Sequence, residues 1–163
     1  MNVTELVDLL GVRADDPSLK RKWAQYGIDL GSSLVLAEGE FNAYVVHQSE
    51  GIELVFTDAA MFLGQMDVPV GEGPLYFTGI FVYRERRDGY ERYEGPLPFG
   101  LNAAIDRGSL LLIFGTPSWH RSRADGRVAA ERWDLNDSCR VQATYATEEQ
   151  LSVLSLSKPD KRE

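Results

Sequence analysis

The sequence predicts an α+β protein in which two tandem units, each a helical part followed by antiparallel strands, form one curved antiparallel sheet with helices on one face. Two observations lead to this class. Apolar residues recur at helical spacing in two places, each closed by a glycine, once before Gly11 and once before Gly115. The segments that follow alternate apolar and polar residues between turn residues, as antiparallel strands do. A chain of 163 residues fits a single domain, residues 1–163, with pseudo-repeat halves 1–94 and 95–157 and a flexible tail at 158–163.

Two short helices are predicted at the N-terminus. Asn2 can cap the first, Glu5 stands three residues later in capping-box position, and Gly11 ends it. Asp16 followed by Pro17 begins the second, because Asp caps helices and Pro suits the first helical position. Both helices carry an apolar stripe, so we expect one side of each to face the core.

Three strands are expected in the first half. From Ser32 onward the apolar spacing changes from helical to alternating. Residues 41–47 form a strand, a turn follows at 49–51, and residues 52–56 return antiparallel. Residues 59–66 are a short helical turn or a loop, and residues 68–74 are a loop. Residues 75–83 are apolar at odd and even positions alike, which predicts a central strand covered on both faces.

The stretch from Gly95 to Trp119 begins the second half, and the two halves are expected to be hinged at Pro96–Gly100. Prolines and glycines at 95–100 end the preceding strand, and Asp106 can cap a short helix that Gly115 ends. Residues 118–128 are expected to form an exposed hairpin loop, followed by strands at 132–135, 140–145 and 151–156. The strand at 140–145 alternates cleanly, so one of its faces is wet, and we expect one face of the sheet to be open.

The net charge of −8 is concentrated in the first half of the chain. Residues 1–75 hold twelve acids and four bases, whereas residues 76–163 hold thirteen of each. No Lys or Arg lies between Lys22 and Arg84, a stretch that holds eight acids. A field of one sign steers a basic partner, although a solvated acidic face that only keeps a protein soluble has the same pattern. The lack of bases argues against nucleic acid as the ligand.

The composition indicates a protein of a reducing compartment, and we expect it in the cytoplasm. No apolar run approaches the roughly 18 residues that span a membrane, and Glu5 and Asp8 stand where a signal peptide would be apolar. Cys139 is the only cysteine, so no intrachain disulfide can form. We expect Cys139 to be a small core residue rather than a nucleophile.

No pattern of catalytic or metal-binding residues stands out. His47 and His120 are the only histidines, and neither has a second ligand at metal-binding spacing. No Gly-x-Ser-x-Gly elbow is present, and the glycine-rich residues 71–74 lack the lysine and helix of a phosphate loop. Glu38 and Glu40 share one side of an extended segment, a pattern that surface charge also produces. We expect no cofactor, no metal and no enzyme activity, although the sequence leaves open an enzyme with a pocket that it does not reveal.

A longer pattern resembles a known family. It comprises residues 90–101, Tyr-Glu-Arg-Tyr-Glu-Gly-Pro-Leu-Pro-Phe-Gly-Leu, then an apolar helix ending in Phe-Gly-Thr-Pro at 114–117, then Arg-Trp-Asp at 132–134 and a Val-x-Ala-x-Tyr strand. This pattern is similar to that of the bacterial immunity proteins of polymorphic and contact-delivered toxin systems. The helix-then-strands unit also resembles the tandem unit of the β-lactamase inhibitor protein and of the lipoprotein BamE. The resemblance implies binding through the open sheet face or its loops, and it implies no catalytic residues.

The acidic stretch and the resemblance together predict an immunity protein that binds a cognate, basic bacterial toxin and masks its active site. Acids would contact the basic surface, and aromatic residues are candidate anchors because they dominate binding hot spots, although each can instead belong to the core. The expected partner-binding residues are Glu38, Glu40, Tyr44, Glu50, Glu53, Asp58, Tyr90, Tyr93 and Trp119. The alternative is a non-catalytic assembly or scaffold module that self-associates through its open sheet face. The oligomeric state, monomer or homodimer, therefore stays open.

Overall fold

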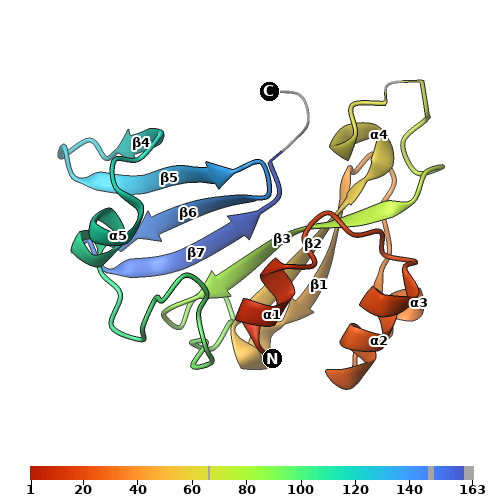
Figure 1. Ribbon diagram of the computed structural model, residues 1–163, viewed down its shortest axis with the longest axis horizontal. Helices are drawn as coiled ribbons and strands as arrows, with labels where there is room; N and C mark the ends of the chain where they lie inside the picture. The colour runs from red at the N-terminus through yellow and green to blue at the C-terminus, as the bar shows by residue number, and fades with distance from the viewer. Residues whose placement is uncertain (66, 147–148, 160–163) are drawn as a thin grey trace.

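The structure, a computed structural model, describes residues 1–65, 67–146 and 149–159. Its strands form one antiparallel sheet of seven in the order β1-β2-β3-β7-β6-β5-β4 (Figure 1). With the short helices, this sheet confirms the α+β class. The strands are β1 (Asn42–His47), β2 (Ile52–Asp58), β3 (Leu75–Tyr83), β4 (Trp119–Ser122), β5 (Val128–Asn136), β6 (Cys139–Tyr145) and β7 (Leu151–Ser157).

The predicted helix starts are confirmed by their caps. The side chain of Asn2 accepts from the Thr4 N–H, and Asp16 and Asp106 cap α2 (Pro17–Gln25) and α5 (Arg107–Phe114) in the same way. Gly115 follows α5 with a positive φ, as predicted. The helical elements are α1 (Val3–Val7), α2 (Pro17–Gln25), α3 (Leu30–Ser33), the 3₁₀ turn η1 (Gln48–Glu50), α4 (Ala59–Phe62) and α5 (Arg107–Phe114).

The N-terminal and C-terminal parts of the chain form separate halves of the sheet. The first half consists of β1, β2 and β3, which pair in succession, and the second half consists of β4, β5, β6 and β7, which also pair in succession. The halves join through β3 and β7, whose register runs from Gly79 opposite Ser157 to Tyr83 opposite Val153. The last strand of each half therefore lies inside the sheet, and β1 and β4 are its two edges.

One hydrophobic core lies between the helices and one face of the sheet. Burial alternates along β2, so Ile52 and Leu54 face this core while their neighbours point the other way. Leu6 of α1, Trp23 of α2 and Leu110 of α5 belong to the same cluster. Figure 1 shows α1, α2 and α3 beside the first half and α5 beside the second. The face opposite the core is called the open face below.

Four expectations about single elements need correction. The segment expected to be extended from Ser32 begins with the end of α3, which runs to Ser33. The exposed hairpin expected at 118–128 is present, but its first arm is an edge strand, β4, that pairs with β5. β3 lies inside the sheet as predicted, but Phe81 and Tyr83 on its open side are only half-buried. Lys158, the first residue of the expected tail, still contacts the sheet, because its N–H donates to the Thr78 carbonyl at 2.8 Å.

Two expectations reach beyond the described residues. Of the segment 59–66, residues 59–62 form the helical turn α4, while residue 66 lies outside the described part. Of the expected tail, residues 160–163 lie outside it as well. Among the helices that are described, none is long and apolar enough to cross a membrane.

Candidate functional site: the open sheet face

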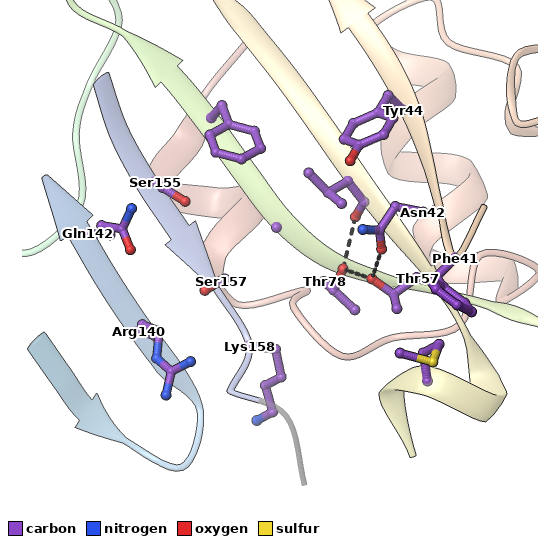
Figure 2. A pocket seen from close by; sticks show the side chains of 14 residues that line it. Phe41, Asn42, Tyr44, Thr57, Thr78, Arg140, Gln142, Ser155, Ser157 and Lys158 are labelled. Carbon is purple, nitrogen blue, oxygen red and sulfur yellow. Dashed lines mark hydrogen bonds between the residues drawn. The ribbon is translucent and has the colours of Figure 1, made fainter. Parts of the chain in front are cut away.

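A hollow of about 440 Å³ lies on the open face where the two halves of the sheet meet (Figure 2). Gly79 of β3 stands at its centre between Val55 of β2 and Ser157 of β7. A Cβ placed on Gly79 would lie 3.4 Å from the Val55 Cβ, so the missing side chain leaves this space open. The lining residues are Phe41, Asn42, Tyr44, Val55, Thr57, Met61, Thr78, Gly79, Phe81, Arg140, Gln142, Ser155, Ser157 and Lys158.

A chain of side-chain hydrogen bonds connects the first three strands at the hollow. The Thr57 hydroxyl donates to Asn42 Oδ1 at 2.8 Å, and the Thr57 and Thr78 hydroxyls lie 2.6 Å apart. Thr78 also reaches the Val55 carbonyl at 3.4 Å. Figure 2 shows this chain of contacts across β1, β2 and β3. The hydroxyls are thus already paired within the protein, and they stabilise the bulge at Val55/Phe56 that bends β2 here.

The opposite side of the hollow is basic. Arg140 of β6 donates from Nε to Asp134 of β5 at 2.5 Å, and Asp134 lies beside it in the strand register. Lys158 follows β7, and its carbon chain passes 3.5 Å from where a Cβ of Gly11 would stand. Among the described residues, no carboxylate lies within ion-pair distance of the Lys158 ammonium. Figure 2 shows Arg140 and Lys158 on one side of the hollow and Tyr44 on the other.

Four of the predicted contact acids lie around β1 and β2 at different depths. Glu38 and Glu40 are exposed and directly precede β1. Glu50 is exposed in η1, where its carboxylate pairs with the Met1 amine at 2.7 Å. Glu53 of β2 is half-buried on the open face and accepts from the Tyr90 hydroxyl. The first half of the open face is therefore bordered by carboxylates.

Two predicted aromatic anchors are exposed but far apart in the sheet. Tyr44 is 47% exposed on β1, and Trp119 is 38% exposed on β4. These strands are the opposite edges of the sheet, so one small contact does not cover both residues. The Trp119 ring already has a cation–π contact within the protein, because the Arg132 guanidinium lies 5.6 Å from its ring centre.

Three predicted contact residues are buried and have structural roles instead. Asp58 is fully buried, and its carboxylate accepts from the N–H groups of Ala60 at 2.9 Å and Gly71 at 3.1 Å. The acid therefore caps α4 and fixes the loop after it. Because its side chain has no exposed surface, Asp58 has none to offer a partner.

The other two buried residues are tyrosines of the segment between β3 and α5. Tyr93 donates to the Met1 carbonyl at 3.0 Å and accepts from the Val3 N–H at 3.2 Å, so it fastens the N-terminus. Tyr90 stacks on Tyr83 with ring centres 3.9 Å apart, and burial, with the neighbouring Glu53 carboxylate, raises its pKa. Neither tyrosine is a surface anchor.

Several residues of the hollow could not be predicted as neighbours. The alternation at 140–145 predicts a wet face that contains Arg140 and Gln142, so this part was open to prediction. Phe81 and Lys158 could not be predicted to line the hollow, since Phe81 lies in a uniformly apolar run and Lys158 in the expected tail. Their approach depends on the pairing of β3 with β7, strands separated by most of the second half.

In the described part of the chain, the titratable side chains form no cluster arranged for catalysis or metal binding. Among the described residues, no group of three or more His, Cys, Asp and Glu could hold a metal ion. Burial raises the pKa of the Cys139 thiol to about 11, so this group is protonated and unreactive at neutral pH. His47 and His120 lie on β1 and β4, the opposite edges of the sheet.

Comparison with known proteins gives no relative. No family model matches the chain, and neither a curated protein nor a solved structure shows significant similarity to it.

Proposed function

We propose that this protein is an immunity-type inhibitor, acting in the cytoplasm, that binds a basic bacterial toxin and masks its active site. The supporting observation is the distribution of charge over the sheet. The stretch without Lys or Arg, residues 23–83, contains the entire first half of the sheet. Glu38 and Glu40 are exposed before β1, where they attract a basic surface, and Glu50, which pairs with the Met1 amine, is exposed after it.

The order of elements supports a finer proposal about the fold. We propose that the protein consists of two tandem helix-then-strand units of the β-lactamase inhibitor type. In the first, α1 to α3 precede a three-stranded meander, and in the second, α5 precedes a four-stranded one. Such proteins offer an open sheet face to a partner, which is the face that carries the hollow here.

The first experiment is capture of the partner. The tagged protein is fixed to a resin, lysate of its source cells is passed over it, and bound proteins are eluted with rising salt. We expect one stoichiometric basic protein that is released only at high salt or by denaturant. Return of the protein itself alone would contradict the inhibitor and favour the self-associating scaffold.

A matched pair of charge reversals then tests the role of the first half. Glu40→Lys on the rim of β1 should slow association with the captured protein about tenfold at low salt. Asp137→Lys changes the net charge equally but lies in the exposed β5–β6 turn, and we expect little change from it. Equal effects would show that only total charge matters. Glu53 is unsuitable for this test because it bonds to Tyr90.

A further inference from the structure

The two edges of the sheet differ in how they are protected against pairing with another strand. β4 has four residues, a bulge at Arg121/Ser122 and a charged side chain at Arg121, all features that discourage further pairing. β1 has six residues in regular register with β2, and no Lys, Arg, Asp or Glu lies between Glu40 and Glu50. A long, uncharged edge of this kind is a template for an added strand.

The pairing of β1 with β2 determines which backbone groups of β1 are free. The Asp58 N–H donates to the Phe41 carbonyl at 2.9 Å, so these two residues form a hydrogen-bonded pair. Hydrogen-bonded pairs alternate along an antiparallel ladder, which directs the backbone groups of Ala43 and Val45 toward β2. Those of Tyr44, Val46 and Asn42 point away from β2, and no backbone hydrogen bond outside the strand pairing involves them in the described residues.

The side chains at this edge are apolar and accessible. Phe41 is 43% exposed, Tyr44 47% and Val46 50%. Tyr44 and Val46 stand two residues apart, so both point to the open face next to the hollow. A strand added beside β1 would bury these side chains and extend the wall of the hollow formed by Tyr44.

Acidic residues lie at both ends of the same edge. Glu38 and Glu40 precede β1, and Glu50, whose carboxylate also pairs with the Met1 amine, follows it; all three are exposed. A strand laid along β1 with lysine or arginine at its two ends would place opposite charges together at each end. The edge is thus complementary to a basic segment in charge as well as in hydrogen bonding.

We propose that the free edge of β1 receives an extended segment of the partner protein, with basic residues on both sides of an alternating apolar stretch. This inference rests on the proposed function, since it names the part of a basic partner that the inhibitor binds. The segment adds an eighth strand to the sheet, donates to and accepts from the outward backbone groups of Asn42, Tyr44 and Val46, and packs its apolar side chains on Tyr44 and Val46.

A second copy of the chain is the poorer occupant of this edge. Two β1 strands paired antiparallel would bring the residues before β1 in one copy next to the residues after β1 in the other. Glu38 and Glu40 would then approach Glu50, and like charges across a strand pair destabilise it. A basic segment meets no such repulsion.

Hydrogen exchange with a synthetic peptide tests this inference even before the partner is identified. The probe is a peptide of alternating valine and threonine with two lysines at each end, and a matched peptide carries glutamates instead. At saturating lysine peptide we expect the amides of Asn42, Tyr44 and Val46 to exchange about tenfold more slowly, because each gains a hydrogen bond. The amides of Ala43, Val45 and β4 serve as internal controls and should not change.

Three outcomes would overturn the inference: no protection with the lysine peptide, equal protection with both peptides, or protection at high protein concentration without peptide, which would identify a second copy as the occupant. Val46→Pro removes one outward N–H without touching the β2 pairing and should abolish the peptide-induced protection, whereas Val46→Thr keeps that N–H and should retain it. If the captured partner binds Val46→Pro as tightly as wild type, β1 is not the binding site, but the proposed inhibitor function is still supported. If the peptide protects the β1 edge but no basic partner is captured, strand addition at β1 is supported and the proposed inhibitor function is contradicted.

Discussion

The two halves of the sheet are attached to their helices by different means. In the first half, Trp23 of α2 meets Phe77 edge-on with ring centres 5.2 Å apart, and Phe56 lies 5.3 Å from Phe77. In the second half, Arg107 of α5 donates from two nitrogens to Glu131 at 3.0 and 2.7 Å, and Tyr145 donates to the same carboxylate at 2.8 Å. The first half is joined by aromatic packing, whereas the second combines an aromatic contact, Phe114 with Trp133 at 5.7 Å between ring centres, with an ion pair to the nearly buried Glu131 carboxylate.

The composition of the helices explains this difference. α2 is amphipathic and directs Leu19 and Trp23 into the core. The last five residues of α5 are all apolar, yet Leu110 is its one fully buried residue, and Leu112 is 90% exposed. With one fully buried side chain, α5 gains less from apolar burial than α2, which buries two. The charged contact at its first residue therefore contributes much of its attachment.

The largest expected effect is in the aromatic contact. Trp23→Ala removes a fully buried ring and should lower the free energy of unfolding by about 4 kcal/mol, measured by urea denaturation. Trp119→Ala is the matched control, because the same side chain is lost from a partly exposed position. We expect it to cost under about 1 kcal/mol. Similar losses for both would mean that the packing around Trp23 contributes little.

The next effect is in the ion pair. Arg107→Ala leaves the nearly buried Glu131 carboxylate without its cation and should cost about 3 kcal/mol in urea denaturation. Arg86→Ala breaks a pair in which both partners are exposed, Arg86 with Glu91, and should cost under about 0.5 kcal/mol. Arg107→Lys keeps the charge but loses the bidentate contact with Glu131, so we expect an intermediate loss in the free energy of unfolding. Equal costs for Arg107→Ala and Arg86→Ala would contradict this account of α5.

Local patterns predict much of this fold, and the exceptions share a cause. Caps at Asn2, Asp16 and Asp106, and alternation in β2, β6 and β7, depend on neighbours in sequence and are readable there. β4 is exposed along its whole length and has no alternation to detect. α3 is a single turn, too short to establish a periodicity.

The candidate site was harder to predict than the fold. Exposure of Glu38, Glu40 and Tyr44 follows from local pattern, but the burial of Asp58 does not, because it depends on a loop that returns Gly71 to its carboxylate. The hollow itself requires β3 beside β7. The sequence of neither strand alone indicates that pairing, so the position of Lys158 on the same side of the hollow as Arg140 was found only in the structure.

The smallest effect concerns Asp134, a carboxylate that pairs with a base on the open face of the second half. The Arg140 guanidinium, with help from the Ser118 hydroxyl, holds the pKa of Asp134 below its usual range. An Asp whose pKa is depressed by folding stabilises the protein above its unfolded pKa, near 4, and loses this contribution as the pH falls through the lower folded value. The side chain is 38% exposed, so solvent screening limits the contribution to under about 1 kcal/mol.

Asp134→Asn should therefore lower the stability at pH 6 and match wild type near pH 2, as measured by urea denaturation at each pH. Asp137→Asn, exposed in the adjacent turn, is the control and should show no such pH-dependent difference. A difference for Asp134→Asn that is independent of pH would show that the amide disturbs packing rather than charge. In the first half the corresponding open-face acid, Glu53, accepts from a tyrosine hydroxyl instead of a guanidinium. Among the described residues, Glu53 therefore has no cation within ion-pair distance.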